Sequence, residues 1–252
     1  MPGRTFAIGD IHGDIQALRT LLDDRLPALD ASDTLVFVGD YIDRGPDSAG
    51  VIRLLRELPR RTPARVVALR GNHEDAWLEV VDHGWPEFVF PRSNGCLEAL
   101  RSFQGRPVPD EHEAPTGEEM AVMLDGAFLP ADVVDWMRSL PHFYEDEHAI
   151  YVHAGLPRDK AGEGFLHPSK APVPRALLWC RDQAFFRNYR GKLVVFGHTA
   201  TDLLPPELSS YTPEDPADLW AGPSTIGLDT RCGRGGYLTA IELPAMLVYE
   251  SR

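Results

Sequence analysis

The stretch Gly39-Asp-Tyr-Ile-Asp-Arg-Gly-Pro-Asp-Ser48 decides how the rest of the chain is interpreted. It follows Leu35-Val-Phe-Val38, an apolar run typical of a buried strand in a parallel sheet. Glycine and proline then end the strand. Asp40, Asp43 and Arg44 are therefore expected on a loop at the carboxyl end of a strand, where open α/β sheets bind their ligands. Two carboxylates and an arginine on one short loop predict a site for a metal and an anion.

The succession of strand, polar loop and helix around this stretch predicts an α/β fold. Alternation of this kind favours a parallel sheet covered by helices. Asp47 or Ser48 is a plausible N-cap for the second helix, and the prolines after it are expected to end that helix. The expected elements are strand 4–9, loop 10–14, helix 15–26, strand 35–38, helix 49–58, a break at 59–63, strand 65–70 and the loop Gly71-Asn-His-Glu74.

The pattern changes after the third unit. Residues 77–140 predict helices separated by loops, which we interpret as an insertion into the domain. Strands return at 149–155 and 193–199, and each ends in a histidine. The apolar run 177–181 between them ends in Arg181. The tail alternates apolar residues with glycine and proline breaks, which predicts short β-structure at 225–229 and 237–249.

Composition narrows the class of protein. The 252 residues, 43% of them apolar and 25% charged, fit one large α/β domain spanning 1–252. A formal net charge of −13 argues against binding to duplex nucleic acid. Neither a signal-peptide pattern nor an apolar run of about 18 residues occurs, so no membrane partner is expected. Cys96, Cys180 and Cys232 are read as reduced thiols of a cytoplasmic protein, and no oligomeric state is predicted.

Polar side chains at five strand ends form the strongest signal. A single histidine or aspartate after a strand is usually structural, but five coincident clusters indicate a shared site. Carboxylate, imidazole and amide donors suit a first-row metal, with Mn²⁺ preferred here and Fe, Zn or Ni as alternatives. Six donors fit two divalent ions that share a bridging carboxylate. The clusters are Asp10 with His12, Asp40, Asn72 with His73, His153, and His198.

These motifs resemble those of the calcineurin-like metallophosphoesterases. More narrowly, they are similar to the phosphoprotein phosphatases, including small bacterial and phage serine/threonine phosphatases. The resemblance runs from about Ile8 to Thr199 and keeps the order of the motifs. It rests on Gly9-Asp-Ile-His-Gly13, Gly39-Asp-Tyr-Ile-Asp-Arg-Gly45, Gly71-Asn-His-Glu74, His153-Ala-Gly155 and Gly197-His198.

The resemblance implies both a fold and a set of metal ligands. The fold is a four-layer α-β-β-α sandwich of two β-sheets flanked by helices, with the C-terminal strands in the second sheet. Asp10 and His12 would bind one ion and Asp40 would bridge the two. The second ion would be bound by Asn72, His153 and His198.

The expected reaction is attack on phosphorus by a hydroxide that bridges the two ions. His73 is the candidate general acid for the leaving oxygen, and Asp43 is expected to orient it and favour its charged form. Arg44 and Arg181 are expected to bind the phosphate oxygens, together with Asn72.

Other polar residues have less specific expectations. Asp14 and Glu74 are predicted to cap the helices that follow them. Asp229 and Arg231, beside the glycine-rich turn, are candidates to reach the site from the second sheet. Five histidines without a strand-end partner are interpreted as structural or exposed: His83, His112, His142, His148 and His167.

Three functions compete on the sequence alone. The preferred one is hydrolysis of phosphomonoesters, with phosphoserine or phosphothreonine of proteins as the substrate and small phosphoesters as an alternative. Asp43 and Glu74 favour it, because the similar symmetrical diadenosine tetraphosphatases commonly carry a non-acidic residue and an aspartate there. Dinucleotide hydrolysis is nevertheless the main alternative, since 225–230 followed by Gly235-Gly236 resembles the tail of those enzymes. A non-catalytic metal-binding scaffold is disfavoured, because metal binding alone requires neither His73 nor Arg44.

Overall fold

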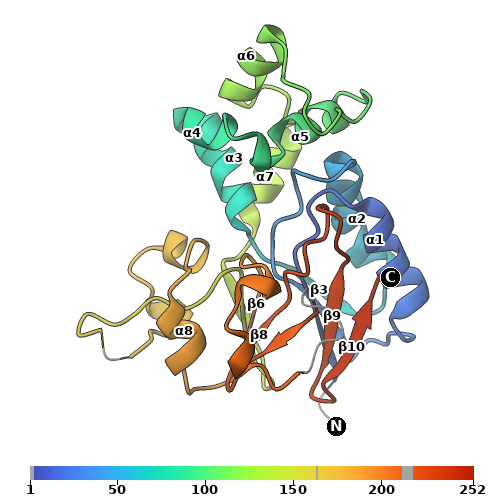
Figure 1. Ribbon diagram of the computed structural model, residues 1–252. Coiled ribbons are helices and arrows are strands. Elements are labelled where there is room, and N and C mark those ends of the chain that lie inside the picture. The colour runs from blue at the N-terminus through green and yellow to red at the C-terminus, as the bar shows by residue number, and fades with distance from the viewer. Residues whose placement is uncertain (1–2, 163, 212–217) are drawn as a thin grey trace.

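The computed structural model describes residues 3–162, 164–211 and 218–252 of the predicted domain 1–252. Two five-stranded sheets lie face to face in the lower part of the molecule (Figure 1). In the first sheet β1 (Thr5–Ile8), β2 (Thr34–Phe37) and β3 (Arg65–Ala68) are parallel, as the alternation predicts. Antiparallel β9 (Thr239–Leu243) pairs with β1, and β10 (Leu247–Glu250) pairs with β9.

The second sheet has β5 (Ile150–Val152), β6 (Val194–Phe196) and β8 (Thr225–Gly227) as parallel neighbours. Its edges are two antiparallel strands, β4 (Phe143–Glu145) and β7 (Trp220–Ala221), which the sequence did not reveal. The C-terminal strands were expected in this sheet. That is correct for β8 and wrong for β9 and β10, which complete the first sheet. Every residue of β9 is buried, so its own pattern does not distinguish between the sheets.

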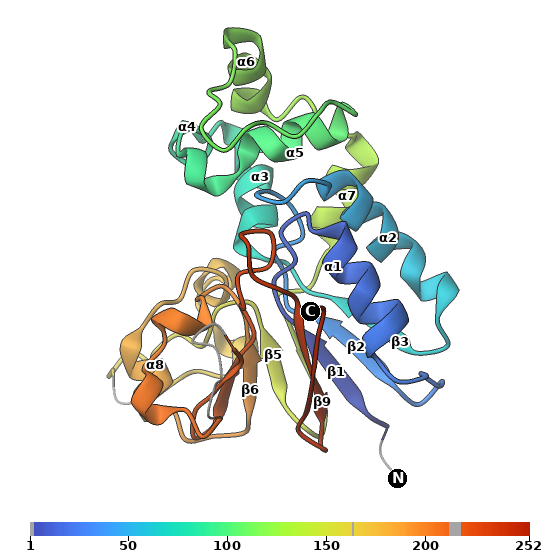
Figure 2. The ribbon, with the colours of Figure 1, turned by 45° about the vertical axis from the view of Figure 1, so that its right-hand side comes forward.

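Helices cover both outer faces, giving the four-layer α/β sandwich (Figure 2). The helices α1 (Ile15–Arg19) and α2 (Ser48–Arg61) lie on the first sheet, and α8 (Gln183–Asn188) on the second. A π-helical turn, η1 (Thr20–Arg25), continues α1. The predicted break at Pro59 is wrong, because α2 continues through this proline to its last turn.

The strands alternate between the inner and outer faces of the sheets. Phe6 and Ile8 of β1 pack under the helices of the first sheet, whereas Ala7 between them packs against the second sheet. Val194 and Phe196 pack with the aromatic residues of α8, and Val195 faces the first sheet. This period of two is what burial on both faces of a sandwich requires.

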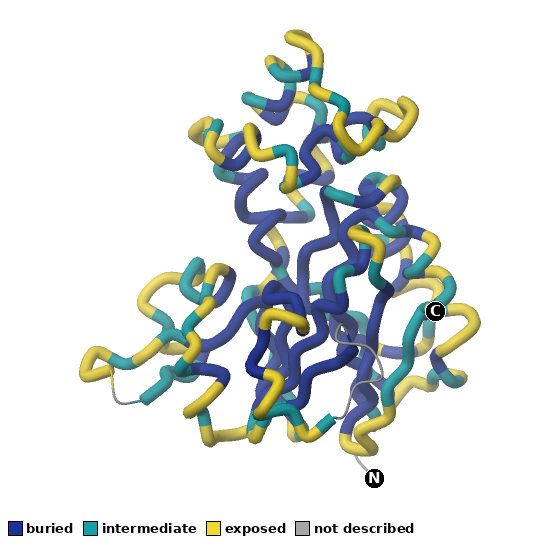
Figure 3. The backbone as a smooth tube through the Cα atoms, in the orientation of Figure 1, coloured by how far each residue is buried: buried dark blue, intermediate teal, exposed yellow. Residues whose placement is uncertain are grey.

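The predicted insertion is helical and rises above the strand ends as a separate projection (Figures 1 and 3). Its first helix begins at Asn72, earlier than expected, so that Asn72 and His73 lie in a helical turn. Its elements are α3 (Asn72–His83), α4 (Pro86–Val89), η2 (Arg92–Asn94), α5 (Cys96–Phe103), α6 (Gly117–Asp125) and α7 (Ala131–Ser139).

Four short 3-10 turns complete the described chain: η3 (Pro168–Lys170), η4 (Pro174–Leu177), η5 (Thr201–Leu203) and η6 (Pro206–Leu208). The apolar run 177–181 forms no strand: its first residue ends η4 and the other four continue as irregular chain. Within the described residues, no helix combines the length and apolar character needed to cross a membrane.

Candidate metal centre and phosphate site

The six predicted metal ligands converge where the carboxyl ends of the two sheets meet. Loops after β1 and β2 and the first turn of α3 contribute donors from the first sheet. Loops after β5 and β6 contribute the histidines from the second. All six residues are buried: Asp10, His12, Asp40, Asn72, His153 and His198.

Asp40 lies between two groups of donors. Its Oδ2 is 3.5 Å from Nε2 of His12 and 3.9 Å from Nε2 of His73. Its Oδ1 is 3.4 Å from Nε2 of His153. Asp40, His12 and His73 place their donor atoms within 4.8 Å of one another, and so do Asp40, His153 and His198. A carboxylate shared by two such groups is the arrangement that a bridging ligand needs.

Asn72 and Asp10 complete the two groups. Oδ1 of Asn72 lies 2.8 Å from Nε2 of His153 and 2.7 Å from Nδ1 of His198. Oδ2 of Asp10 accepts the backbone N–H of His198 at 2.9 Å. The other oxygen, Oδ1, is buried and has no hydrogen-bond partner among the described residues. An unsatisfied buried carboxylate oxygen is costly, and coordination to a cation would satisfy it.

The charges of these buried groups also fit a metal. Burial raises the pKa of Asp40 to about 7, and burial together with Asp229 and Asp40 raises the pKa of Asp10 well above its usual range. Burial lowers the pKa of His153 to about 4 and that of His198 far below normal. Neutral imidazole is the form that binds metals, and repelling carboxylates are stabilised by positive charge.

The backbone of this region is strained. A non-glycine residue with left-handed φ costs roughly 1–2 kcal/mol. Seven such residues occur in the described chain, and five of them belong to the predicted site. Strain gathered at one place is typical of a functional site. The five are His12, Asp40, Asp43, Arg44 and His198, whose φ values lie between 46° and 75°.

His73 makes the predicted pair with Asp43. Its Nδ1 is 2.6 Å from Oδ2 of Asp43, and the indole of Trp77 donates to both carboxylate oxygens at 2.9 and 3.0 Å. Nε2 of His73 therefore faces the donor groups. Burial, followed by the charge of Arg44, lowers the pKa of His73 well below its usual range. The expected preference of His73 for its charged form is not what these surroundings produce, whereas its expected orientation by Asp43 matches the geometry.

The two predicted phosphate-binding arginines reach the site from different elements. Arg44 contacts Nε2 of His12 through one terminal nitrogen, and its other one lies 3.0 Å from Nε2 of His73. Arg181 donates from Nε to Nε2 of His198 at 2.9 Å. Both guanidinium groups therefore border the metal donors.

Glu74 does more than cap a helix. Its carboxylate accepts the backbone N–H of Gly71 at 2.9 Å, which is the predicted cap. It also accepts the N–H groups of Asp40 at 3.0 Å and Tyr41 at 2.8 Å. Burial, with Asp40 next, raises the pKa of Glu74 to about 7. Glu74 thus ties the Asp40 loop to α3, a role that its position in the sequence did not reveal.

The remaining predicted residues are helix caps, a carboxylate near the site, and histidines outside it. Asp14 and Asp47 cap α1 and α2 by accepting the N–H groups of Ala17 and Gly50, as predicted. Asp229 is buried close enough to Asp10 to raise its pKa. The set expected to be structural or exposed contributes to neither donor group: His83, His112, His142, His148 and His167.

Arg231 turns away from the site, and Arg234 was not anticipated. Arg231 forms a two-point ion pair with Asp202, from Nε to Oδ1 at 3.0 Å and from Nη2 to Oδ2 at 2.8 Å. Arg234, three residues later, lies close enough to lower the pKa values of His12 and His73. Only its place in the glycine-rich turn hinted at this position.

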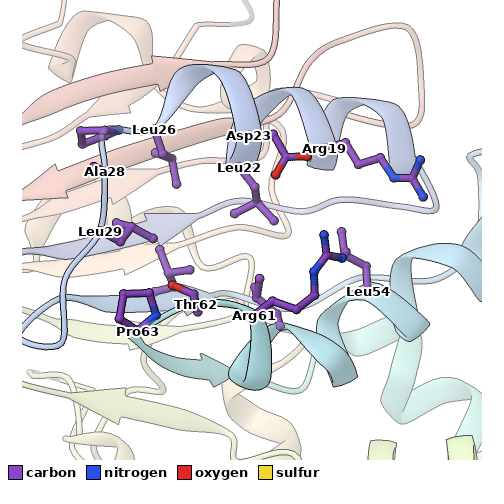
Figure 4. Close-up of a pocket in the computed structure, with 13 residues that line it drawn as sticks. Arg19, Leu22, Asp23, Leu26, Ala28, Leu29, Leu54, Arg61, Thr62 and Pro63 are labelled. Carbon is purple, nitrogen blue, oxygen red and sulfur yellow. The ribbon is translucent and has the colours of Figure 1, made fainter.

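A separate hollow of about 650 Å³ lies near the amino ends of β2 and β3, away from the metal donors (Figure 4). Leu22, Leu26 and Leu29 line it together with Arg19 and Arg61. No predicted site residue borders it, so it belongs to the helix–sheet packing and not to the chemistry.

Two mixed sheets flanked by helices, with buried carboxylate and imidazole donors between their strand ends, define the metallophosphoesterase class. The chain belongs to the calcineurin-like phosphoesterases, whose family model matches residues 3–202.

Several curated relatives are named as dinucleotide hydrolases. The chain is 29% identical to the symmetrical bis(5'-nucleosyl)-tetraphosphatase of Stutzerimonas stutzeri, over 69% of this chain and 51% of that protein. It is 25% identical to the asymmetrical bis(5'-nucleosyl)-tetraphosphatase PrpE of Bacillus mycoides, over 95% of this chain and 90% of that protein. The chain thus spans about half the length of the symmetrical relative. The crystal structure of a candidate diadenosine tetraphosphatase shares the fold, with a TM-score of 0.58, 24% identity and coverage of 99% and 93% of the two chains.

Proposed function

We propose that this protein is a dinuclear-metal phosphoesterase that hydrolyses dinucleoside tetraphosphates. The observation that carries the metal-dependent chemistry is the pair of buried donor groups that share Asp40. The names of the relatives favour a dinucleotide over a phosphoprotein, so the order of the two substrates is the reverse of that expected from Asp43 and Glu74.

Six residues are proposed to hold the two ions, which we expect to be Mn²⁺. Asp40 would be shared by the two ions, Asp10 and His12 would hold one of them, and three donors would hold the other: Asn72, His153 and His198. When bound, two divalent ions lower the pKa of a water and supply positive charge for the phosphate.

Residues of the chain are proposed to bind the reacting phosphate and to supply a proton to the leaving oxygen. Arg44 and Arg181, placed against the donor histidines, bind the non-bridging oxygens of the reacting phosphate, and the amide of Asn72 assists. The negative charge of a bound phosphate would raise the pKa of His73, and the protonated imidazole is proposed to donate from Nε2 to the leaving oxygen while Asp43 holds Nδ1.

An aromatic surface beside the donors supports a nucleotide substrate. Trp179 is exposed, its ring centroid lies 6.1 Å from that of His198, and it meets Trp85 edge to face at 5.8 Å. The guanidinium carbon of Arg175 lies 4.8 Å from the Trp85 ring centre. Bases stack on exposed aromatic rings and on arginine, so this surface is proposed to receive one of the two nucleobases.

Phosphomonoester hydrolysis, including that of phosphoserine proteins, remains the second candidate. The observation in its favour is the contact of 2.6 Å between His73 and Asp43. A proton donor matters most for a poor leaving group such as a serine alkoxide, and least for a polyphosphate.

One comparison tests the proposal. Under excess Mn²⁺, kcat/KM is measured for diadenosine tetraphosphate and for a phosphoserine peptide, and the nucleotide products are separated. We expect a much larger kcat/KM for the dinucleotide. Two molecules of ADP would identify symmetrical cleavage, and ATP with AMP would identify asymmetrical cleavage. A larger value for the peptide would establish the second candidate, and turnover of neither substrate by metal-loaded protein would indicate a binding scaffold.

A further inference from the structure

Three arginines border the donor groups, and among the described residues none of them forms a direct ion pair with a carboxylate. Within the described chain, neither Arg44 nor Arg181 nor Arg234 has a carboxylate oxygen within ion-pair distance. Arg231, in the same turn as Arg234, is by contrast paired with Asp202. Unpaired cationic groups around one site are suited to an anion that carries several charges.

The turn before β9 holds Arg234 against the metal-binding loop. Gly233 adopts a left-handed φ of 73°, and a Cβ there would lie 2.4 Å from the carbonyl oxygen of His12. Only glycine therefore allows the turn to approach His12 this closely. Figure 2 shows the chain before β9 rising toward the insertion. The next residue, Arg234, reaches the insertion, where its side chain meets the backbone at Ser93.

Backbone carbonyl oxygens of the insertion accept hydrogen bonds from both Arg234 and Arg44. Nη2 of Arg234 donates to the carbonyl oxygen of Ser93 at 2.5 Å. Two residues later, the carbonyl oxygen of Gly95 accepts the backbone N–H of Arg44 at 3.3 Å. A Cβ on Gly95 would lie only 2.1 Å from the nitrogen of Arg44. One short segment of the insertion, 93–95, thus positions two arginines from opposite ends of the chain.

The two guanidinium groups also influence each other. Burial, followed by the charge of Arg44, lowers the pKa of Arg234 to about 10. Arg234 is therefore still charged at neutral pH. The charges of Arg44 and Arg234 repel each other, whereas Asp229 and Asp40 attract Arg234, and an anion that contacts both guanidinium groups would add to that attraction.

We propose that Arg234 binds a second, non-reacting phosphate group of a polyphosphate substrate, while Arg44 and Arg181 bind the reacting one. This inference rests on the proposed function, because it concerns the same site and makes polyphosphates its preferred substrate class. A phosphomonoester has a single phosphate and would leave Arg234 without a contact. The insertion thereby acts in substrate selection through Ser93.

The test compares Arg234→Gln with Arg231→Gln, a matched change in the same turn. Binding of inorganic tripolyphosphate and of a methylene-bridged dinucleoside tetraphosphate is measured by titration calorimetry with Mn²⁺ present. Turnover of diadenosine tetraphosphate and of p-nitrophenyl phosphate is measured alongside. We expect Arg234→Gln to weaken polyphosphate binding and dinucleotide kcat/KM by about tenfold or more, with p-nitrophenyl phosphate turnover changed less than about twofold. We expect Arg231→Gln to change each value less than about twofold.

Equal losses on both substrates, or no loss on either, would overturn the assignment. So would a loss of Mn²⁺ binding by Arg234→Gln, since that would make Arg234 part of the metal centre. If wild-type protein cleaves p-nitrophenyl phosphate but not the dinucleotide, the proposed substrate is wrong. The tripolyphosphate titration would then still decide whether Arg234 binds a polyphosphate.

Discussion

Asp40 shows how one residue serves two purposes that conflict. Its carboxylate is buried beside Asp10, which is unfavourable for the fold, yet its two oxygens face both donor groups. Buried charges that repel each other destabilise a protein until a cation neutralises them. Function at this position is therefore expected to come at the expense of stability.

Asp40→Asn tests this conflict. We expect the variant to lose turnover and Mn²⁺ binding, because the shared ligand is gone. In excess chelator at pH 8 we expect it to melt at a higher temperature than wild type, because one buried negative charge has been removed. Thermal unfolding, calorimetric metal titration and steady-state rates are the measurements. Retained turnover would show that Asp40 does not bridge the ions.

His73→Asn separates proton donation from metal binding. We expect the variant to bind Mn²⁺ normally and to lose about 10²–10⁴-fold in rate on a phosphoserine peptide, with a smaller loss on p-nitrophenyl phosphate, a better leaving group. Rates on the two substrates and a metal titration are the measurements. Unchanged activity on the peptide would refute the general-acid role. Weakened metal binding would instead assign His73 as a ligand, as its distance of 3.9 Å from Asp40 also allows.

The place of some site residues could be predicted from the sequence, and the place of others could not. The metal-ligand candidates each follow a predicted strand, and parallel strand ends meet at one edge, so their convergence could be predicted. Glu74 and Arg234 could not be interpreted in this way. Their partners, the Asp40 amides and the Ser93 carbonyl, come from segments whose approach depends on tertiary packing.

Among the elements, the insertion contains a cluster of charges in which Arg101 and Glu119 are buried. Arg101 of α5 donates from Nε to Glu119 of α6 at 2.8 Å and also contacts Glu113. The hydrogen bond from Arg101 is the main reason that the pKa of Glu119 falls to about 2. The pKa is lower in the folded protein than in the unfolded chain. The stabilisation is therefore complete above about pH 4.5 and is lost as the pH falls toward 2.

Glu119→Gln tests this contribution. We expect the variant to lose about 1–3 kcal/mol of unfolding free energy at pH 7, because Arg101 loses a charged partner. The difference from wild type should shrink as the pH falls from about 4.5 to 2. Urea unfolding across this range is the measurement. Asp82→Asn, which breaks an exposed pair with Arg138, is the control and should have little effect. A difference that does not change with pH would contradict this account.

Secondary structure could be predicted where an element's own pattern determines it. The three parallel strands of the first sheet were predicted because each is a short apolar run that ends in a polar loop, and the helices of the insertion because their apolar residues recur at helical spacing. The membership of β9 and β10 in the first sheet could not be predicted. All of β9 is buried, so its pattern of apolar residues fits either sheet. The helix break predicted at Pro59 was also wrong, since a proline near the end of a helix interrupts fewer backbone hydrogen bonds than one in the middle.

On the scale of the whole molecule, the donor groups join the two sheets. Asp10, Asp40 and Asn72 come from the first sheet, and His153 and His198 come from the second. A ligand that binds only the folded state stabilises it by about 2.7 kcal/mol at one hundred times its dissociation constant. Metal ions bound between the sheets should therefore stabilise the entire fold.

Metal removal tests this coupling. We expect a chelator to lower the melting temperature of wild type at pH 7.5 by about 5–10 °C, and Mn²⁺ to restore it. Differential scanning calorimetry is the measurement. Asp40→Asn should show no such response. A wild-type melting temperature that is independent of both chelator and Mn²⁺ would show that the sheets are not joined by metal.

The left-handed backbone at Asp40, Asp43 and Arg44 has a consequence for how the protein tolerates mutation. Glycine adopts this conformation freely, whereas valine and isoleucine do so at high cost. In a saturation library scored for cellular abundance, glycine at these positions should be enriched and β-branched residues depleted. The same library scored for turnover should lose the glycine variants. A position where glycine raises abundance but abolishes turnover would be one where selection for activity has kept a residue that the left-handed backbone disfavours.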